Sequence, residues 1–169
     1  SMYVGRRQEA GELATTPKFS RLFSGRKLGK TALLKYIEHN YQGYEMPSGR
    51  RLRVLYLSIV GRDNGAALFE LLRPELLEAL GGADREAQEV QAFRQEHAGY
   101  ESEDDLLSML KSYLELMSQE NLFVILDEAD VFVEAQLAEY EEKRERCLTF
   151  RLRSEFGSDT EEPRVHFVF

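Results

Sequence analysis

The chain has 169 residues, a formal net charge of −8 and a single cysteine, Cys147. One cysteine cannot form an internal disulfide, so the composition favours a protein of the reducing cytoplasm over a disulfide-stabilised secreted one. No stretch of the sequence approaches the roughly 18 consecutive apolar residues of a membrane helix, so no membrane is expected as a partner.

Charge is divided unevenly along the chain. Residues 1–53 contain 11 Lys and Arg against 4 Asp and Glu, whereas residues 54–169 contain 11 against 26. The basic first third favours an anionic ligand in that region. The acidic remainder argues against a broad nucleic-acid interface, which needs Lys and Arg clustered on one face, but a local contact by the basic third stays open.

The first predicted elements lie in this basic third. Residues 19–23 alternate in polarity and contain two phenylalanines, as in a short strand. Apolar side chains from Ala32 to Ile37 then recur at helical spacing. Residues 24–31 therefore lie between a strand and a helix.

Residues 24–31 read Ser-Gly-Arg-Lys-Leu-Gly-Lys-Thr. They fit the phosphate-loop pattern G-x-x-x-x-G-K-[ST], except that Ser24 occupies the first glycine position and Gly25 follows it. Backbone N–H groups of such a loop cradle phosphates at the positive end of a helix, while its lysine reaches the β/γ-phosphates and its hydroxyl binds Mg²⁺. The segment predicts a nucleoside triphosphate site that uses Lys30 and Thr31.

The middle of the chain predicts a second strand and two helices. Residues 52–60 are nearly all apolar and predict a strand, and residues 66–80 predict a helix in which Pro74 restarts the helix at its first turn. Residues 83–101 are polar and weakly periodic, so we expect a surface excursion there. Ser102 with Asp105 forms a capping-box pattern. An amphipathic stripe that we assign to the core follows: Leu106, Leu107, Leu110, Tyr113, Leu114 and Met117.

The second chemical motif is residues 122–128, Leu-Phe-Val-Ile-Leu-Asp-Glu. Five consecutive apolar residues predict a strand buried on both faces. Asp127 emerges at its carboxyl end, where open α/β sheets place ligands, and can hold Mg²⁺ through water. The adjacent Glu128 can orient or deprotonate an attacking water. With the phosphate loop upstream, the pair predicts magnesium-dependent hydrolysis of a nucleoside triphosphate.

The last third predicts a charged helix over residues 137–153, a turn-rich loop over 157–163 and a fourth strand over 165–169. Strand–helix alternation predicts an α/β fold, a three-layer sandwich with a mostly parallel central sheet. The chain ends in apolar residues, so we expect the domain to be truncated after the fourth strand and to continue beyond Phe169. The three histidines, His39, His97 and His166, stand in no metal-ligand or nucleophile–base spacing, and we assign them no chemistry.

The chain resembles P-loop ATPases that carry an additional catalytic glutamate, and within them the AAA+/STAND group of signalling and regulatory ATPases. The resemblance rests on residues 3–6, 23–34 and 126–132, which include the Walker A motif at 24–31 and the last three residues of the Walker B motif at 122–128. It implies one P-loop ATPase core over residues 1–169 that binds ATP or ADP with Mg²⁺ and drives or gates a protein partner or a homo-oligomer. In such proteins the fourth strand lies between the first and the third.

The resemblance also implies a role for each matched position. Lys30 and Glu128 would be catalytic, with Glu128 as the base that activates water. Thr31 and Asp127 would bind the metal. The nucleotide would contact residues of the amino-terminal segment, the loop and the first helical turn: Val4, Gly5, Arg6, Ser24, Gly25, Arg26, Lys27, Leu28, Gly29, Lys30, Thr31 and Ala32.

Other functions fit parts of the sequence. Residues 127–130 spell the Asp-Glu-Ala-Asp of RNA helicases, but residues 58–63 differ from the helicase segment expected after the second strand. A small GTPase is disfavoured because Asp130 stands where its Asp-x-x-Gly spacing requires glycine. A non-hydrolysing nucleotide switch and a DNA-loading AAA+ ATPase both stay open. Turnover separates the first from an ATPase, and salt-sensitive binding to duplex DNA would support the second.

Overall fold

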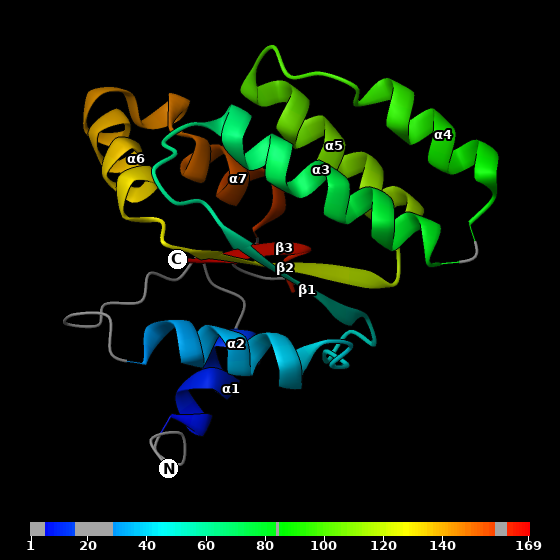
Figure 1. Cartoon of the computed structure of the whole chain (residues 1–169), viewed down its shortest axis with the longest axis horizontal. Helices are drawn as coiled ribbons and strands as arrows, with labels where there is room; N and C mark the ends of the chain where they lie inside the picture. Colours follow the sequence, from blue (N-terminus) through cyan, green and yellow to red (C-terminus); the bar gives the residue numbers. More distant parts are fainter. Residues whose placement is uncertain (1–5, 16–28, 84, 158–161) are drawn as a thin grey trace.

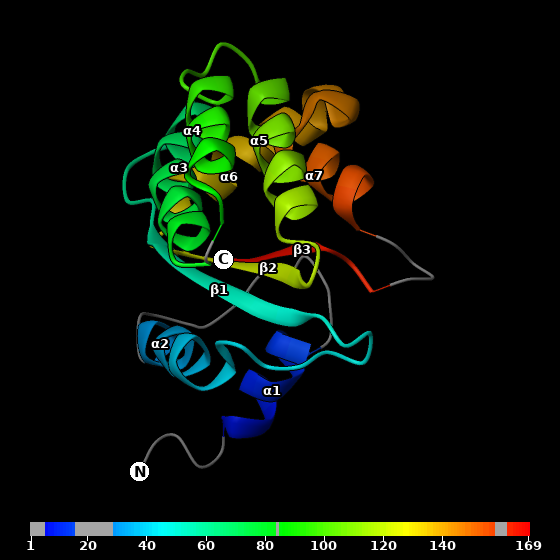
Figure 2. The ribbon, with the colours of Figure 1, turned by 90° about the vertical axis from the view of Figure 1, so that its right-hand side faces the viewer.

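The computed structural model describes residues 6–15, 29–83, 85–157 and 162–169. These residues form an open, all-parallel, three-stranded sheet with helices on both faces (Figures 1 and 2). The strands are β1 (Arg51–Ser58), β2 (Glu120–Asp127) and β3 (Val165–Val168). The helices are α1 (Arg7–Thr15), α2 (Lys30–Tyr41), α3 (Gly65–Gly81), α4 (Ala87–Glu96), α5 (Glu103–Leu116), α6 (Asp130–Lys143), the 3₁₀ turn η1 (Arg144–Arg146) and α7 (Leu148–Phe156). The α/β class expected from the sequence is confirmed.

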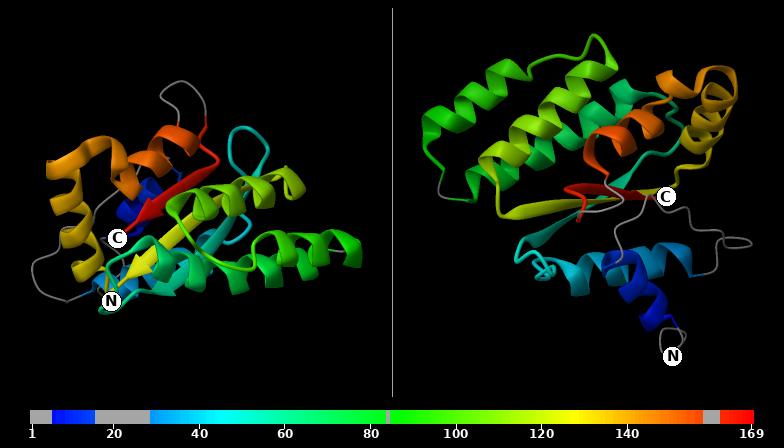
Figure 3. Two further views of the ribbon diagram at one scale, coloured as in Figure 1. Left: turned by 90° about the horizontal axis from the view of Figure 1, so that it is seen from above. Right: turned by 180° about the vertical axis from the view of Figure 1, so that it is seen from behind.

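The strand order is β1-β2-β3, so β2 is the middle strand (Figure 3). β1 and β2 pair in register from Arg51 opposite Glu120 to Ser58 opposite Asp127. Residues 165–168 pair with residues 122–125, so the predicted fourth strand lies beside the predicted third, one of the two neighbours that the resemblance implies for it. The strand predicted at residues 19–23 and most of the phosphate loop lie outside the described residues.

Alternation along the strands divides the core into two layers. Leu122, Val124 and Leu126 of β2 face α3, α5, α6 and α7, whereas Phe123 and Ile125 face α1 and α2. Every residue from Asn121 to Asp127 is buried, as the continuous apolar run predicts for a strand covered on both faces. Within the described ranges, no helix is both long and apolar enough to cross a membrane.

The region predicted as a surface excursion is mostly exposed, but it contains a helix, α4, which the weak periodicity of the segment did not predict. α4 buries Phe93, and the Arg73 guanidinium of α3 donates to the carbonyl oxygens of Arg94 and His97 over 3.1 and 2.6 Å. These bonds close the end of α4 and attach it to α3. A long-range partner therefore stabilises a helix whose own periodicity is weak.

Pro74 does not restart a helix; it lies inside the continuous helix α3, which corrects the sequence prediction. A proline inside a helix costs about 3 kcal/mol because it removes one backbone bond and crowds the preceding turn. On both sides of Pro74, the leucines Leu68, Leu72, Leu76 and Leu80 are fully buried. Their burial offsets the cost of the proline.

The charged helix predicted over residues 137–153 is two helices, which also corrects the sequence prediction. Cys147 is extended between η1 and α7, and the buried Gln136 side chain accepts bonds from the Cys147 thiol at 3.3 Å and the Thr149 N–H at 3.1 Å. The break lets α7 bury Leu148 and Leu152, which one straight helix could not present together with the apolar side of α6. The capping box at Ser102 and Asp105 and the buried stripe of α5 are confirmed.

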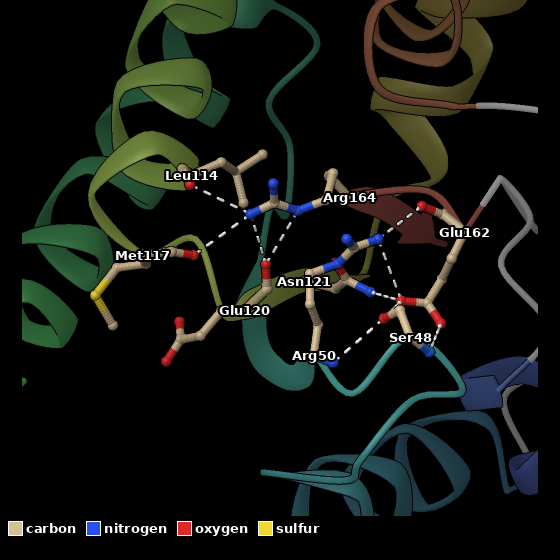
Figure 4. Close-up of polar contacts among 8 residues, drawn as sticks. All are labelled: Ser48, Arg50, Leu114, Met117, Glu120, Asn121, Glu162 and Arg164. Carbon is tan, nitrogen blue, oxygen red and sulfur yellow. Dashed lines mark hydrogen bonds and ion pairs between the residues drawn. The ribbon is translucent and has the colours of Figure 1, made fainter.

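A polar network closes the amino-terminal edge of the sheet, opposite the predicted nucleotide site (Figure 4). Asn121 accepts from Arg50 Nε at 2.8 Å and donates to Glu162 at 2.7 Å. Arg164 donates to three main-chain carbonyl oxygens, those of Leu114, Met117 and Glu120, at 2.9–3.4 Å. Arg164 therefore ties the end of α5 and the start of β2 to the start of β3.

Replacing Arg164 by methionine is expected to lower the free energy of unfolding by about 1–3 kcal/mol, because three carbonyl oxygens lose a charged donor. Urea denaturation measures the change. Arg146→Met is the matched control, since Arg146 is exposed and its loss should change stability by less than about 0.5 kcal/mol. Equal stability of the two variants would contradict a structural role for Arg164.

Candidate functional site

The two predicted metal residues lie together although 96 positions separate them in the sequence. Asp127 ends β2 and is buried, and Thr31 is the second residue of α2, which begins near the carboxyl ends of the strands (Figure 1). Thr31 Oγ1 donates a hydrogen bond to Asp127 Oδ2 over 3.0 Å. The fold therefore places a hydroxyl and a carboxylate at the edge where α/β sheets bind ligands.

The backbone at Gly29 favours glycine because its φ of 90° lies in the left-handed region. A Cβ at this position would lie 3.1 Å from Nη1 of Arg6, the end of a flexible side chain. Gly29 then starts α2, because its carbonyl oxygen accepts from the Leu33 N–H at 2.9 Å. The Arg6 guanidinium, which also pairs with Glu9 at 3.0 Å, thus lies beside the first turn of α2.

The start of α2 has the electrostatics of an anion site. The N–H groups of the first turn have no partner within a helix, and they lie at the positive end of its dipole. No side chain caps this end of α2 among the residues described. Lys30 and Arg6 add positive charge. Ala32 is the third residue of the first turn of α2. Most other residues predicted to contact nucleotide lie outside the described residues: Val4, Gly5, Ser24, Gly25, Arg26, Lys27 and Leu28.

Three donors hold the Asp127 carboxylate. Thr31 and the hydroxyl of Tyr56 donate to Oδ2, and the Glu128 backbone N–H donates to Oδ1 at 2.9 Å. Tyr56 lies on β1, two residues before its end, and burial raises the pKa of its hydroxyl, as does the bond to Asp127. The hydroxyl is therefore a neutral donor at physiological pH. Since an ionised carboxylate offers about four acceptor positions, about one is left for a further partner.

Glu128 has an unusual backbone. Its φ of 54° is the only positive value at a non-glycine residue within the described chain, a conformation that costs roughly 1–3 kcal/mol and is concentrated at functional sites. Its side chain is exposed, and Oε1 accepts from the Ser58 hydroxyl at 3.3 Å. Glu128 thus points to the end of β1 while Asp127 points to α2.

Sequence reasoning assigned no role to Tyr56 or Ser58. Ser58 carries a usable signal, because it lies near the end of the strand predicted over residues 52–60, and the ends of parallel strands meet at one edge of a sheet. Tyr56 carries none, since its contact with Asp127 depends on the register between β1 and β2.

The donor set fits Mg²⁺. Hydroxyl and carboxylate oxygens are hard ligands, and Mg²⁺ in phosphate sites usually binds one or two carboxylates together with waters and phosphate oxygens. Among the described residues, no group of three or more His, Cys, Asp or Glu side chains is arranged to hold a metal. Thr31 and Asp127 would accordingly need a bound phosphate to complete such a site.

Comparison of this chain with protein-family models, with curated proteins and with solved structures found no match. The interpretation of the site therefore depends on its own residues.

Proposed function

We propose that this chain is the ATP-binding core of a regulatory or signalling P-loop ATPase that hydrolyses ATP with Mg²⁺ and drives or gates a protein partner or oligomer. The observation that carries the proposal is the hydrogen bond between Thr31 and Asp127. Two motifs chosen from the sequence for binding one metal ion meet at 3.0 Å, on the edge of the sheet where the proposal needs them. A chance Gly-Lys-Thr on a surface loop would have no reason to lie there.

The roles of the residues follow from their positions. The N–H groups at the start of α2 and the charges of Lys30 and Arg6 would bind the phosphates. Thr31 and Asp127 would hold Mg²⁺, which when bound neutralises charge on the phosphate oxygens. Glu128 would take the proton of the attacking water. Of these groups, only Asp127 is buried, so the others are accessible to a ligand from solvent.

Titration calorimetry with Mg·ATP tests the proposal. The chain is expected to bind, and Lys30→Ala is expected to weaken binding about 10- to 100-fold, because one bond to a charged group contributes about 1.5–3 kcal/mol. Lys143→Ala, at an exposed position on α6, is the matched control and should bind like the parent. No binding by the folded parent chain, or equal affinities of both variants, would refute the proposed site.

One contact favours a second candidate, the non-hydrolysing nucleotide switch. The Ser58 hydroxyl donates to Glu128 Oε1, so one oxygen of the proposed base already has a partner. A switch of this kind would bind Mg·ATP as strongly as an ATPase but release no phosphate. Turnover measurements on the same samples therefore separate the two candidates.

A further inference from the structure

Tyr56 has a position that no motif in the sequence explains. Its side chain lies on the face of β1 that is covered by α2, and its hydroxyl donates to Oδ2 of Asp127, the oxygen that also accepts from Thr31. Lys35 lies over the ring, with Nζ 3.5 Å from the ring centroid. Because Lys35 follows Thr31 by one helical turn, both residues face Tyr56 from the same side of α2.

The bond from the Tyr56 hydroxyl restricts rotation of the Asp127 carboxylate about its terminal side-chain torsion. The terminal torsion of an aspartate is broad, so a single bond does not fix the plane of its carboxylate. The backbone N–H of Glu128, the next residue in the chain, donates to Oδ1 of Asp127. Thr31 donates to Oδ2 from α2. Tyr56 approaches Oδ2 from the neighbouring strand, so the carboxylate is held from three elements of the structure.

The Tyr56 ring is itself held in place. The ammonium of Lys35 covers one face and also pairs with Glu38 at 3.1 Å, and the ring packs beside the α2 layer of the core. A cation over an aromatic face stabilises that arrangement by about 0.5–1 kcal/mol at an exposed site. The Tyr56 ring is thus packed against α2 while its hydroxyl donates to Asp127.

We propose that Tyr56 is a positioning residue of the magnesium site, whose hydroxyl fixes the Asp127 carboxylate in the orientation that receives the metal. This inference rests on the proposed function, since it assigns Tyr56 to the same site. Partners that orient metal-binding groups commonly change metal affinity or activity 10- to 100-fold when they are removed. Phenylalanine keeps the ring and the contact with Lys35 but removes the hydroxyl.

The test is the affinity of Tyr56→Phe for a non-hydrolysable ATP analogue, measured by titration calorimetry with saturating Mg²⁺ and again in excess chelator. The dissociation constant in chelator divided by the dissociation constant with Mg²⁺ measures the coupling between metal and nucleotide. We expect the ratio to fall 10- to 100-fold in the variant, entirely through weaker binding with Mg²⁺. The matched control is Tyr140→Phe, at an exposed tyrosine of α6, which should keep the parent ratio.

Each other outcome overturns the inference. Equal weakening with and without Mg²⁺ would make Tyr56 a structural residue, and an unchanged ratio would make its bond to Asp127 incidental. If the parent chain binds nucleotide equally well with Mg²⁺ and in chelator, the proposed role of Asp127 in binding the metal is refuted, while nucleotide binding itself is supported. Failure of the parent chain to bind under either condition would refute the proposed function together with this inference.

Discussion

Replacing Glu128 by glutamine is expected to lower ATP turnover by about 10²- to 10⁴-fold, the usual contribution of a positioned general base. The amide cannot accept the proton of the attacking water, but it has nearly the same size. The Ser58 hydroxyl can still donate to its oxygen, and the backbone N–H can still bind Asp127. Mg·ATP affinity should therefore stay within about 2-fold of the parent value, and phosphate release in a single turnover of bound ATP reports the chemical step.

The control for this variant is Glu134→Gln, which removes a negative charge from an exposed position of α6. It should leave turnover unchanged. Unaltered turnover in Glu128→Gln would contradict the role of Glu128 as base. A parent chain that binds Mg·ATP without releasing phosphate would favour the nucleotide switch.

The local geometry explains why Glu128 and its neighbour can have different roles. Two consecutive carboxylates on an extended strand would point to opposite faces of the sheet. At the end of β2 the chain instead turns through the positive φ of Glu128, so its side chain reaches Ser58 at the end of β1. Asp127 remains buried and directed to α2. The turn thus separates the buried carboxylate of Asp127, which we propose holds the metal, from the accessible carboxylate of Glu128.

The elements predicted best from the sequence are those with strong local signals. A continuous apolar run followed by Asp127 predicted a strand buried on both faces, and Ser102 with Asp105 predicted the start of α5. The meeting of Thr31 with Asp127 was predictable as well. A phosphate-loop helix and the strand that ends in the acidic pair must converge for either motif to act on one metal.

The elements that were missed or predicted wrongly depend on partners distant in sequence. α4 is anchored by Arg73 of another helix, and the break at Cys147 depends on the amide of Gln136 in the preceding helix. Tyr56 joins the site only through the register of two strands. No pattern within residues 83–101, 137–153 or 52–60 encodes these contacts, because each involves a side chain on a different element.

The second prediction concerns His166, a buried histidine of β3. Its ring stacks on Phe123 with centroids 4.2 Å apart, and neither ring nitrogen has a hydrogen-bond partner in the part of the chain that the structure describes. Burial lowers the pKa of His166 to about 4, and the negative charge of Glu162 opposes this only in part. An unfolded histidine has a pKa of about 6.5.

The sign of the effect on stability follows from proton binding. Above pH 6.5 the imidazole is neutral in both states and the full stability is present. Between pH 6.5 and pH 4 the unfolded chain binds a proton that the folded chain does not, so the free energy of unfolding falls as the pH falls. The shift of about 2.5 pH units corresponds to about 3 kcal/mol in total, of which about 2 kcal/mol is lost by pH 5.

His166→Leu should abolish this part of the pH dependence, because it removes the ionisable ring and keeps an apolar side chain in contact with Phe123. Urea denaturation at pH 7.5 and pH 5.0 measures it: the parent chain should lose about 2 kcal/mol more than the variant between the two values. Other groups also titrate in this range, including His97, whose pKa burial lowers, but they are common to both chains and cancel in the difference. His39→Leu, at an exposed position of α2, is the control, since it measures how the loss of an imidazole that is not buried changes the free energy of unfolding between the two pH values. Equal losses in the parent chain and His166→Leu would mean that the folded chain protonates His166 as readily as the unfolded chain does, which would contradict this prediction.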